Sequence, residues 1–441
     1  MKFYLRTACI LIIGTLPAVR AVQAQDPPPA PRYIVYDTTT LGGTFAFGSG
    51  VNNLGWVTGA STNATGALHA TLAAPGTLID LGTLGGTNSA VEWPVKNNHG
   101  LVVGISETAT PEPNGEAFSC SGFIPTNGHT CLPFLWQNGD LSPLPLLGGN
   151  NGFATEINNS GIAVGWAETS VADPSCVHPE QVLQFLAVQW GPGRDEKRVL
   201  PPLGDDSVSA ATAINDAGEV VGISGSCDVA IGALSAKHAL LWRHGQPVKL
   251  PTLGGKGWNT PMAINNRGVI AGFSDTPGDL VGKVLTANFQ ATLWTADGIV
   301  NLHTLPGDAT AEATGINDRN QVIGTSFPPP TSTNPSRAFF WQDGKMYDLN
   351  SLVQPSAPLY LISTGDINER GVITGQGCVL PDCTVLHTFV AIVAPPETTD
   401  AEARAESADS ASRPTLSAEL REQLRAHARF WRATPETVPA Q

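Results

Sequence analysis

The feature that most constrains this chain is a short phrase repeated seven times: an apolar residue, Asn, a polar turn and an apolar-rich run. The fourth copy, for example, begins Ile214-Asn215-Asp216-Ala217-Gly218. The first Asn of successive copies stands at positions 52, 97, 158, 215, 265, 317 and 368, so the copies are 45 to 61 residues apart. A period near 50 residues is typical of folds in which each unit is one supersecondary motif that rests on its neighbours. The sequence therefore predicts a repeat architecture.

The fourth repeat shows what one unit contains. Strand-like runs cover 208–214, 219–224, 238–242 and 247–254, and they are separated by turn residues. Asn followed by Gly at a fixed offset suits a hairpin that needs a residue with positive φ. Pro247 in the last run fits an outer strand, where a missing N–H donor is tolerated. Four antiparallel strands per unit predict a blade of a β-propeller.

The two ends of the repeat region complement each other. The repeat region begins with residues 32–43, whose sequence matches the fourth strand of a unit. It ends with residues 386–393, whose sequence matches the third strand of a unit. The seventh unit therefore lacks a fourth strand that the N-terminus can supply, and such a splice removes an exposed sheet edge. The expected fold is all-β, a seven-bladed β-propeller of four-stranded antiparallel blades closed by the N-terminal strand, with a C-terminal linker and short helix.

The segments outside the repeats have distinct compositions. Lys2 and Arg6 precede an apolar stretch too short to span a bilayer, and a small-x-small site ends at Ala24, which predicts an export signal. No later segment is long and apolar enough to cross a membrane. The predicted divisions are a signal peptide at 1–24, a proline-rich lead at 25–31, the repeat domain at 32–394, a flexible linker at 395–414, an amphipathic helix at 415–433 and a disordered tail at 434–441.

Charge and cysteine usage narrow the class of protein. Charged residues make up 14% of the chain and the net charge is −14, which argues against binding to nucleic acid. Outside the predicted signal peptide the chain has six cysteines, and an even number in an exported chain favours disulfides. Short separations suggest Cys120–Cys131 and Cys378–Cys383, which leaves Cys176–Cys227, although six cysteines allow about 15 pairings. A periplasmic or extracellular location is expected.

Length variation is concentrated in one place. The number of residues from the repeated Trp (Trp242 in the fourth unit) to the next Leu is nearly constant. The number of residues from the turn Asn to the Trp, in contrast, varies from 24 to 39. The variable loop therefore joins the second and third strands of each unit. Because strand direction alternates, this loop shares a face with the connections between blades, opposite the Asn turns. Function on repeat folds is usually found on the face that carries insertions.

Several motif elements recur in the same order over residues 32–394. The strings are His238-Ala239-Leu240-Leu241-Trp242, Arg337-Ala338-Phe339-Phe340-Trp341, Leu84-Gly85-Gly86 and Ile214-Asn215. In these elements the chain resembles the HAF-repeat family of bacterial extracellular proteins. The resemblance implies an exported repeat protein and carries no assigned reaction. The chain departs from the pattern in the first unit, which lacks the Trp, in the second, which reads Trp93-Pro94-Val95-Lys96 before its Asn, and in the sixth, where the connection reads Leu305-Pro306-Gly307.

Most prominent side chains have a structural explanation. The repeated Asn residues are expected to cap their own turns, although a ring of ligands is the alternative reading. The repeated Trp and the equivalent His69, His238 and His387 are expected to be structural. Weak candidates for binding are the side chains that break the pattern on the variable face: Asp205, Asp206, Asp308 and Trp258.

Those carboxylates define the possible chemistry. Adjacent carboxylates could bind Ca²⁺ or act as acid and base, but no EF-hand-type ladder is present and no cofactor is identified. His-Glu-x-x-His, Gly-x-Ser-x-Gly and phosphate-binding glycine loops are absent. No catalytic residue is therefore assigned.

The sequence thus favours a non-enzymatic scaffold that binds an extracellular glycan or protein. The alternatives are a propeller hydrolase or lyase that acts on an extracellular polysaccharide, and a structural surface protein without a ligand site. The C-terminal helix is expected to contact either a partner or the propeller itself.

Overall fold

The computed structural model describes residues 30–395, except 117, 194, 229, 231–232, 282–283 and 286–287, together with residues 413–414 and 420. The expected signal peptide, the first part of the proline-rich lead, nearly all of the C-terminal helix and the C-terminal tail lie outside these residues. Regular structure within the described part is almost entirely β-strand. The exceptions are α1 (Phe118–Ser121), η1 (Ala233–Ala236) and η2 (Leu349–Ser351).

The strands form a series of four-stranded antiparallel sheets, as the sequence predicts. Five separate sheets are β6 (Gly85–Ala90), β7 (Val102–Pro111), β8 (His129–Gln137) and β9 (Asp140–Pro143); β10 (Gly148–Ile157), β11 (Ala163–Ala172), β12 (Leu183–Trp190) and β13 (Lys197–Leu200); β14 (Val208–Ile214), β15 (Val220–Gly225), β16 (His238–Arg243) and β17 (Gln246–Lys249); β18 (Asn259–Ile264), β19 (Ile270–Asp275), β22 (Phe289–Thr295) and β23 (Gly298–His303); β24 (Thr310–Ile316), β25 (Val322–Phe327), β26 (Arg337–Gln342) and β27 (Lys345–Asp348). A two-stranded ribbon, β20 (Leu280–Val281) and β21 (Val284–Leu285), lies in the loop between β19 and β22.

The first and last repeats share one larger sheet. It contains β2 (Gly42–Val51), β3 (Val57–Asn63), β4 (Leu68–Ala74) and β5 (Thr77–Asp80), followed by β28 (Leu359–Ile367), β29 (Ile373–Val379) and β30 (Leu386–Val393). The two groups join through a single parallel pair, Phe45 with Leu386. The N-terminal strand β1 (Tyr33–Asp37) pairs antiparallel with β30, so the segment expected to complete the last unit does lie beside its third strand.

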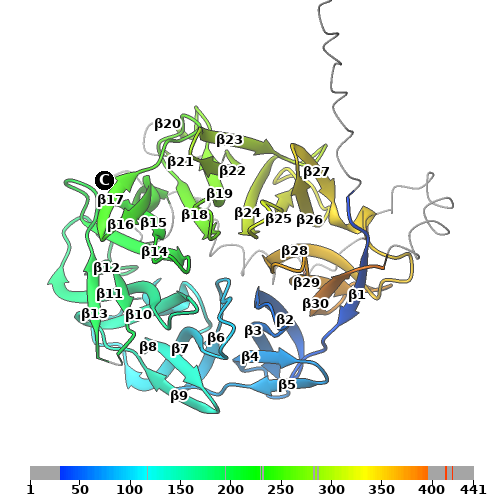
Figure 1. The fold of residues 1–441 in the computed structure, drawn as a ribbon. Coiled ribbons are helices and arrows are strands. Elements are labelled where there is room, and N and C mark those ends of the chain that lie inside the picture. The colour runs from blue at the N-terminus through cyan, green and yellow to red at the C-terminus, as the bar shows by residue number, and fades with distance from the viewer. Residues whose placement is uncertain are drawn as a thin grey trace, which may run out of the picture. The chain divides into compact units, whose positions relative to one another are not determined.

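Figure 1 shows these sheets side by side around a common centre, with β2, β6, β10, β14, β18, β24 and β28 innermost. This is a propeller-like arrangement. Within each unit the chain runs from the inner strand outwards, so the fourth strand is the outermost, consistent with Pro247 in β17.

The sequence of each unit explains its local structure. In the sheet of the fourth repeat, the second strand, β15, begins Val220-Val221-Gly222. A Cβ added at Gly222 would overlap the carbonyl oxygen of Ala210 in the first strand, β14. Gly is therefore required by the close approach of two strands. Turn residues need positive φ, and where the sixth unit replaces the usual Gly, Asn320 adopts a φ of 57°. Asn tolerates this left-handed conformation better than most residues.

The core lies between neighbouring sheets. Trp190, Trp242 and Trp294 are almost completely buried, and each indole N–H donates to a backbone carbonyl of the preceding connection, at Pro145, Pro201 and Pro251. One apolar cluster, for example, joins Val164 and Ala187 of one sheet to Leu240 and Trp242 of the next. Each unit therefore buries its apolar face only against its neighbours, as expected for repeat proteins.

The second unit is irregular, as its departure from the repeat pattern predicts. The first strand of this sheet, β6, ends at Ala90, and residues 91–97 are not paired as a strand. Lys96 stands directly before the turn Asn97, at the position that Val51 and Ile157 hold in their own units.

In the described part of the chain, no helix combines the length and the apolar character that a membrane crossing requires.

Candidate functional site

The seven Asn turns meet at the centre of one face. Each side chain has two roles, illustrated by Asn158. Its Oδ1 accepts the backbone N–H groups of Ser160 and Ile162, both at 3.0 Å, and its Nδ2 donates to the backbone carbonyl of Asn215 at 3.1 Å. The first role confirms the prediction that the Asn caps its own turn. The second role links one repeat to the next and was not foreseen.

The inter-repeat bonds follow one another without a gap. The Nδ2 groups donate to the carbonyl of the equivalent Asn in the next repeat, from Asn52 to Asn97, Asn158, Asn215, Asn265, Asn317 and Asn368, and Asn368 donates back to Asn52. The seven bonds form a closed cycle with lengths from 2.7 to 3.2 Å. The turn asparagines are therefore structural links between repeats.

A second cycle lies one residue further along each turn. The backbone N–H of Asn53 donates to the side-chain oxygen of Asn98, and the same bond recurs from each turn to the next until Glu369 donates to Asn53. Asn, Asp and Glu all serve at this position because each supplies an oxygen acceptor.

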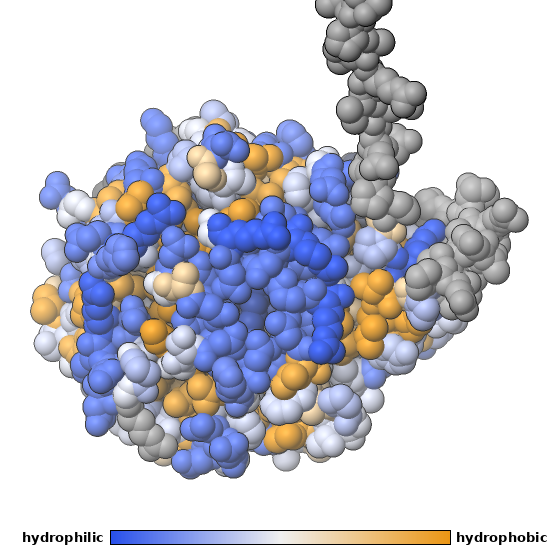
Figure 2. Space-filling model, viewed as in Figure 1, coloured by the Kyte–Doolittle hydropathy of each residue, from blue (hydrophilic) through white to orange (hydrophobic). Residues whose placement is uncertain are grey.

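These turns surround a cavity of about 70 Å³. In Figure 2, hydrophilic side chains gather around a central hollow on the face in view. The cavity is lined by residues of all seven turns and by the side chains of Lys96 and Glu156. A volume of about 10–15 Å³ is enough for one water molecule, so this cavity admits several waters or one small polar group.

Aligning the repeats on the turn Asn reveals three exceptions at the inner ends of the first strands. One residue before the Asn, the copies have Val or Ile, except for Lys96 in the second. Two residues before it, they have Gly, Ala or Val, except for Glu156 in the third and Asp366 in the seventh. Lys96 had been identified from the sequence only as a departure from the pattern. The repeat alignment contained the signal for all three.

The structure brings these exceptions together. The Lys96 ammonium lies 3.1 Å from Oδ1 of Asp366 and donates to the backbone carbonyl of Ile316 at 3.0 Å. Lys96 therefore crosses the cavity from the second unit to the sixth and seventh. Asp366 also accepts the backbone N–H of Val51 at 3.3 Å, and Glu156 makes the equivalent bond to Ile214 at 2.9 Å.

Burial governs the charges of these groups. Burial raises the pKa of Glu156 to about 8, although the nearby Lys96 ammonium and the Ile214 N–H oppose the rise. For Lys96, burial is the largest single influence and disfavours the ammonium, but the carboxylates of Asp366, Glu156 and Glu369 together outweigh it, so the pKa is raised. The Lys96 side chain is 26% exposed although protein surrounds it, because the cavity admits water. The ion pair keeps Lys96 charged, so its amine is not available as a nucleophile.

The opposite face carries the predicted disulfides. Cys120–Cys131, Cys176–Cys227 and Cys378–Cys383 are all bonded, which confirms the pairing suggested by the sequence. Each bond restrains a loop between the second and third strands of a sheet, and Cys176–Cys227 joins the loops of two consecutive sheets. Covalent bonds thus restrain the loops that follow β7, β11, β15 and β29.

The carboxylates predicted as binding candidates have local partners. Asp206 accepts from Ser224 and pairs with His238 at 2.7 Å, whereas its neighbour Asp205 is exposed. The side chain of Asp308 is buried between Arg337 at 2.9 Å and Arg413 at 3.2 Å. Asp206 and Asp308 lie in connections before different sheets, and each has its own local partners.

Trp258 is only 3% exposed and packs against Phe273 and Phe289. A ligand would reach this ring only after the aromatic cluster opened. The equivalent histidines do have structural roles, since His69 pairs with Asp80 and His387 with Asp37, both at 2.8 Å.

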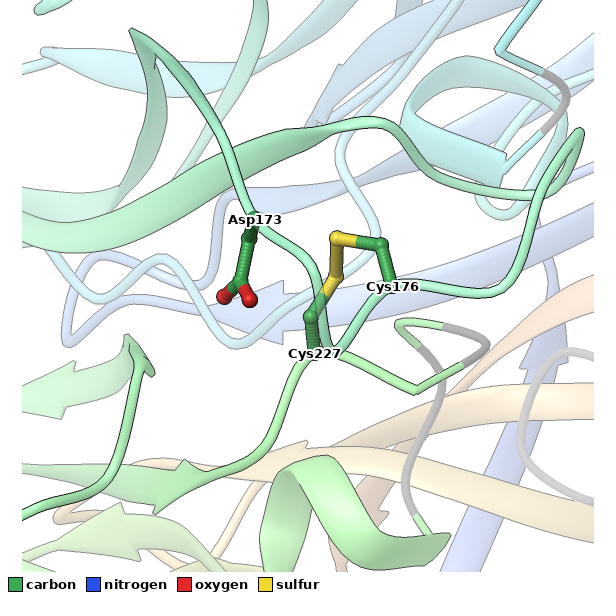
Figure 3. A group of neighbouring side chains, drawn as sticks. All are labelled: Asp173, Cys176 and Cys227. Atoms are coloured by element: carbon green, nitrogen blue, oxygen red, sulfur yellow. A yellow bond between two sulfur atoms is a disulfide. The ribbon is translucent and has the colours of Figure 1, made fainter.

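One group has the residue types of a metal site. Asp173, Cys176 and Cys227 place potential ligand atoms within 4.8 Å of one another, and Figure 3 shows them together. The two cysteines form a disulfide with an S–S distance of 2.02 Å. Metal binding by Cys requires thiolates, so this group does not offer a metal centre while the disulfide is intact.

Two described residues that follow the repeat domain in the chain contact it. Arg413 pairs with Asp308, and Leu420 is buried in a cluster that contains Tyr360, Ile362 and Leu386. The remaining residues of the predicted helix at 415–433 lie outside the described part.

Comparison with known proteins finds structural similarities at low sequence identity. No family model matches the chain, and no curated protein matches it. Among solved structures, a puromycin-hydrolysing peptidase of Mycobacterium tuberculosis is similar over 82% of this chain and 55% of its own, with 11% identity and a TM-score of 0.43. The acylaminoacyl peptidase of Pyrococcus horikoshii is similar over 75% and 49%, with 13% identity and a TM-score of 0.40.

The chain thus spans about half the length of these two structures. AofleA of Arthrobotrys oligospora is similar over 72% of this chain and 89% of its own, with 12% identity and a TM-score of 0.29. Similarities this low do not transfer an activity. The chain is an all-β, propeller-like protein with three disulfides.

Proposed function

We propose that this protein is an exported seven-bladed β-propeller of the HAF-repeat type, closed by β1, that binds another extracellular protein through its loop-bearing face. One observation carries the proposal: the loops joined by Cys176–Cys227 expose large aliphatic side chains. Val177 is 37% and Leu234 is 37% exposed, and Val171, at the end of β11, is 58% exposed.

Fixed loops favour binding. A loop held in one conformation loses less entropy when it binds, so covalent restraint contributes to affinity without new contacts. Exposed aliphatic side chains on fixed loops supply apolar area that a partner can bury. Sugars, in contrast, stack on aromatic faces, and Trp258 and its aromatic neighbours on this side are buried. A protein partner is therefore favoured over a glycan.

The closed cycle of Asn bonds and the pairing of β1 with β30 support the seven-bladed propeller. The three disulfides support an exported, extracellular or periplasmic protein, because such bonds persist in oxidising compartments.

The test uses the full-length mature protein as bait against the extracellular fraction of its source cells, with mass-spectrometric identification and affinity measurement. Val177→Asp combined with Leu234→Asp should weaken binding of a captured protein by about 10-fold or more, because a charge would be buried at the interface. The matched control is Val248→Asp with Val300→Asp, which changes valines of similar exposure, 47% and 43%, on the outer strands β17 and β23.

Equal binding by both double variants would place the interface elsewhere. Recognition on a glycan array without protein capture would replace the protein partner by a sugar. Turnover of a polysaccharide would favour the hydrolase or lyase alternative.

A further inference from the structure

The contacts of the Lys96 ammonium show how the groups around the cavity bind a cation, and we use them as a template for a second cation. It binds one carboxylate oxygen of Asp366 and the carbonyl of Ile316, the residue just before the turn Asn of the preceding repeat. The other oxygen of Asp366 accepts the N–H of Val51 in the following repeat. An acidic residue two positions before the turn Asn thus accepts a backbone N–H with one oxygen and binds an ammonium with the other.

Glu156 occupies the position equivalent to Asp366, and within the described residues it makes only the first of these two contacts, the one with a backbone N–H. Its Oε2 accepts the N–H of Ile214 in the following repeat at 2.9 Å. Its Oε1 makes no hydrogen bond to any residue that the structure describes, although the residue is only 4% exposed and lines the cavity. The carbonyl equivalent to that of Ile316 belongs here to Lys96, because Lys96 precedes the turn Asn of the preceding repeat.

We infer that the central cavity binds a primary ammonium group between Glu156 and the backbone carbonyl of Lys96, in the manner in which Lys96 itself binds Asp366 and Ile316. A primary ammonium has three N–H donors and a compact charge, and it needs only two or three oxygen acceptors.

The charge of the cavity suits such a ligand. Besides Lys96, the groups that act on Glu156 are the carboxylates of Asp366 and Asp216. Glu369 and Asp318, which also line the cavity, are acidic as well. When ionised, these groups outnumber the one internal cation. A metal ion fits less well, because the cavity carboxylates are not among the described residues that gather three ligand atoms within 4.8 Å.

Binding should be linked to protons. Burial raises the pKa of Glu156 to about 8, with Lys96 opposing. An ammonium ligand requires the ionised carboxylate, so its binding should release a proton near neutral pH and become tighter between pH 6 and 8.5, over which methylammonium stays protonated.

The first experiment titrates the mature protein with methylammonium at constant ionic strength, followed by calorimetry in buffers of different ionisation enthalpy. Tetramethylammonium is the ligand control, because it carries the same charge without an N–H donor. Glu156→Gln keeps an acceptor for the Ile214 N–H and should weaken methylammonium binding by about 10-fold. Glu196→Gln, which changes an exposed loop residue, should leave it unchanged.

A second variant tests the template. Lys96→Ala removes the internal ammonium and leaves Asp366 without its cation, so methylammonium should raise the unfolding midpoint of this variant more than that of the wild type. If Lys96→Ala fails to fold, the comparison of wild type with Glu156→Gln decides alone. Equal binding of the two ammonium ions, or equal binding by wild type and Glu156→Gln, would overturn the inference.

The ammonium could come from a free amine or from a lysine side chain. A short lysine-containing peptide tested beside methylammonium separates the two sources. Binding of both favours a lysine side chain, and binding of methylammonium alone favours a free amine.

Discussion

At the scale of single residues, the turn asparagines show how a repeated side chain can serve both its own unit and the next. Sequence spacing predicted the bonds within each turn, because Asn accepts from backbone N–H groups two and four residues ahead. The donation to the next turn was not predictable, because the partner lies 45 to 61 residues away along the chain, and 316 residues away for the bond from Asn368 to Asn52.

Asn158→Asp separates these two roles. The carboxylate keeps both acceptor bonds to Ser160 and Ile162 but cannot donate to the carbonyl of Asn215. We expect a loss of about 1–3 kcal/mol in the free energy of unfolding, measured by urea denaturation, because a buried carbonyl loses its donor. The control is Asn63→Asp, since Asn63 makes the same two turn bonds, to Thr65 and Ala67, in an exposed hairpin. Equal losses at both positions would show that the inter-repeat bond contributes nothing.

Glu156 should make stability depend on pH. Its pKa is raised from 4.5 to about 8 in the folded protein. The folded state therefore holds the proton more tightly, and the resulting stability is present below pH 4.5 and lost as the pH rises through about 8. Glu92 with a pKa of about 8, and Glu116 and Asp275 with pKa values of about 7, act in the same direction, in each case chiefly through burial.

Urea midpoints measured from pH 5 to 8.5 should thus fall with rising pH. Glu156→Gln should flatten this fall by an amount on the order of 1–4 kcal/mol, because the amide does not titrate. A pH dependence identical to that of the wild type would show that Glu156 is ionised throughout.

At the scale of elements, the loops between second and third strands depend on covalent restraint. Cys176–Cys227 links residues 51 apart in sequence, whereas Cys378–Cys383 links residues only 5 apart. A bond that closes a longer loop restricts the unfolded chain more. Replacing both Cys176 and Cys227 by Ser should lower stability by about 2–4 kcal/mol, and the same change at Cys378 and Cys383 should lower it less. Thermal unfolding of the two double variants makes the comparison, and the reverse order would show that the restraint acts mainly in the folded loops.

The prediction of elements from sequence was most accurate where the repeats agree. In the fourth unit the expected strands correspond to β14–β17, with the outer strand shorter than expected. The second unit was recognised as irregular because its residues before the Asn differ from the other copies. What replaces the regular strand there could not be read from the sequence, since the path of residues 91–97 depends on packing against neighbouring units.

At the scale of the whole molecule, the two ends of the repeat region hold each other. β1 pairs with β30 through Tyr36 and Val390, among others. Tyr36→Pro removes one N–H from this ladder and should cost about 1–3 kcal/mol and promote aggregation through the exposed edge of β30. Tyr36→Ala is the matched control, because the side chain is 52% exposed and its removal leaves the backbone intact. Denaturation and light scattering of both variants provide the measurement, and equal behaviour would argue that β1 does not seal the sheet.

The sequence by itself predicted the number and content of the repeats and the all-β class, because these depend on local spacing and composition, and it suggested the disulfide partners without excluding other pairings. The tertiary structure alone decided which exceptions to the repeat matter. Lys96, Glu156 and Asp366 come from three different units and are up to 270 residues apart in the sequence. They meet only because the inner strands of all the units converge on one cavity, where a buried charge must find its partner across the ring.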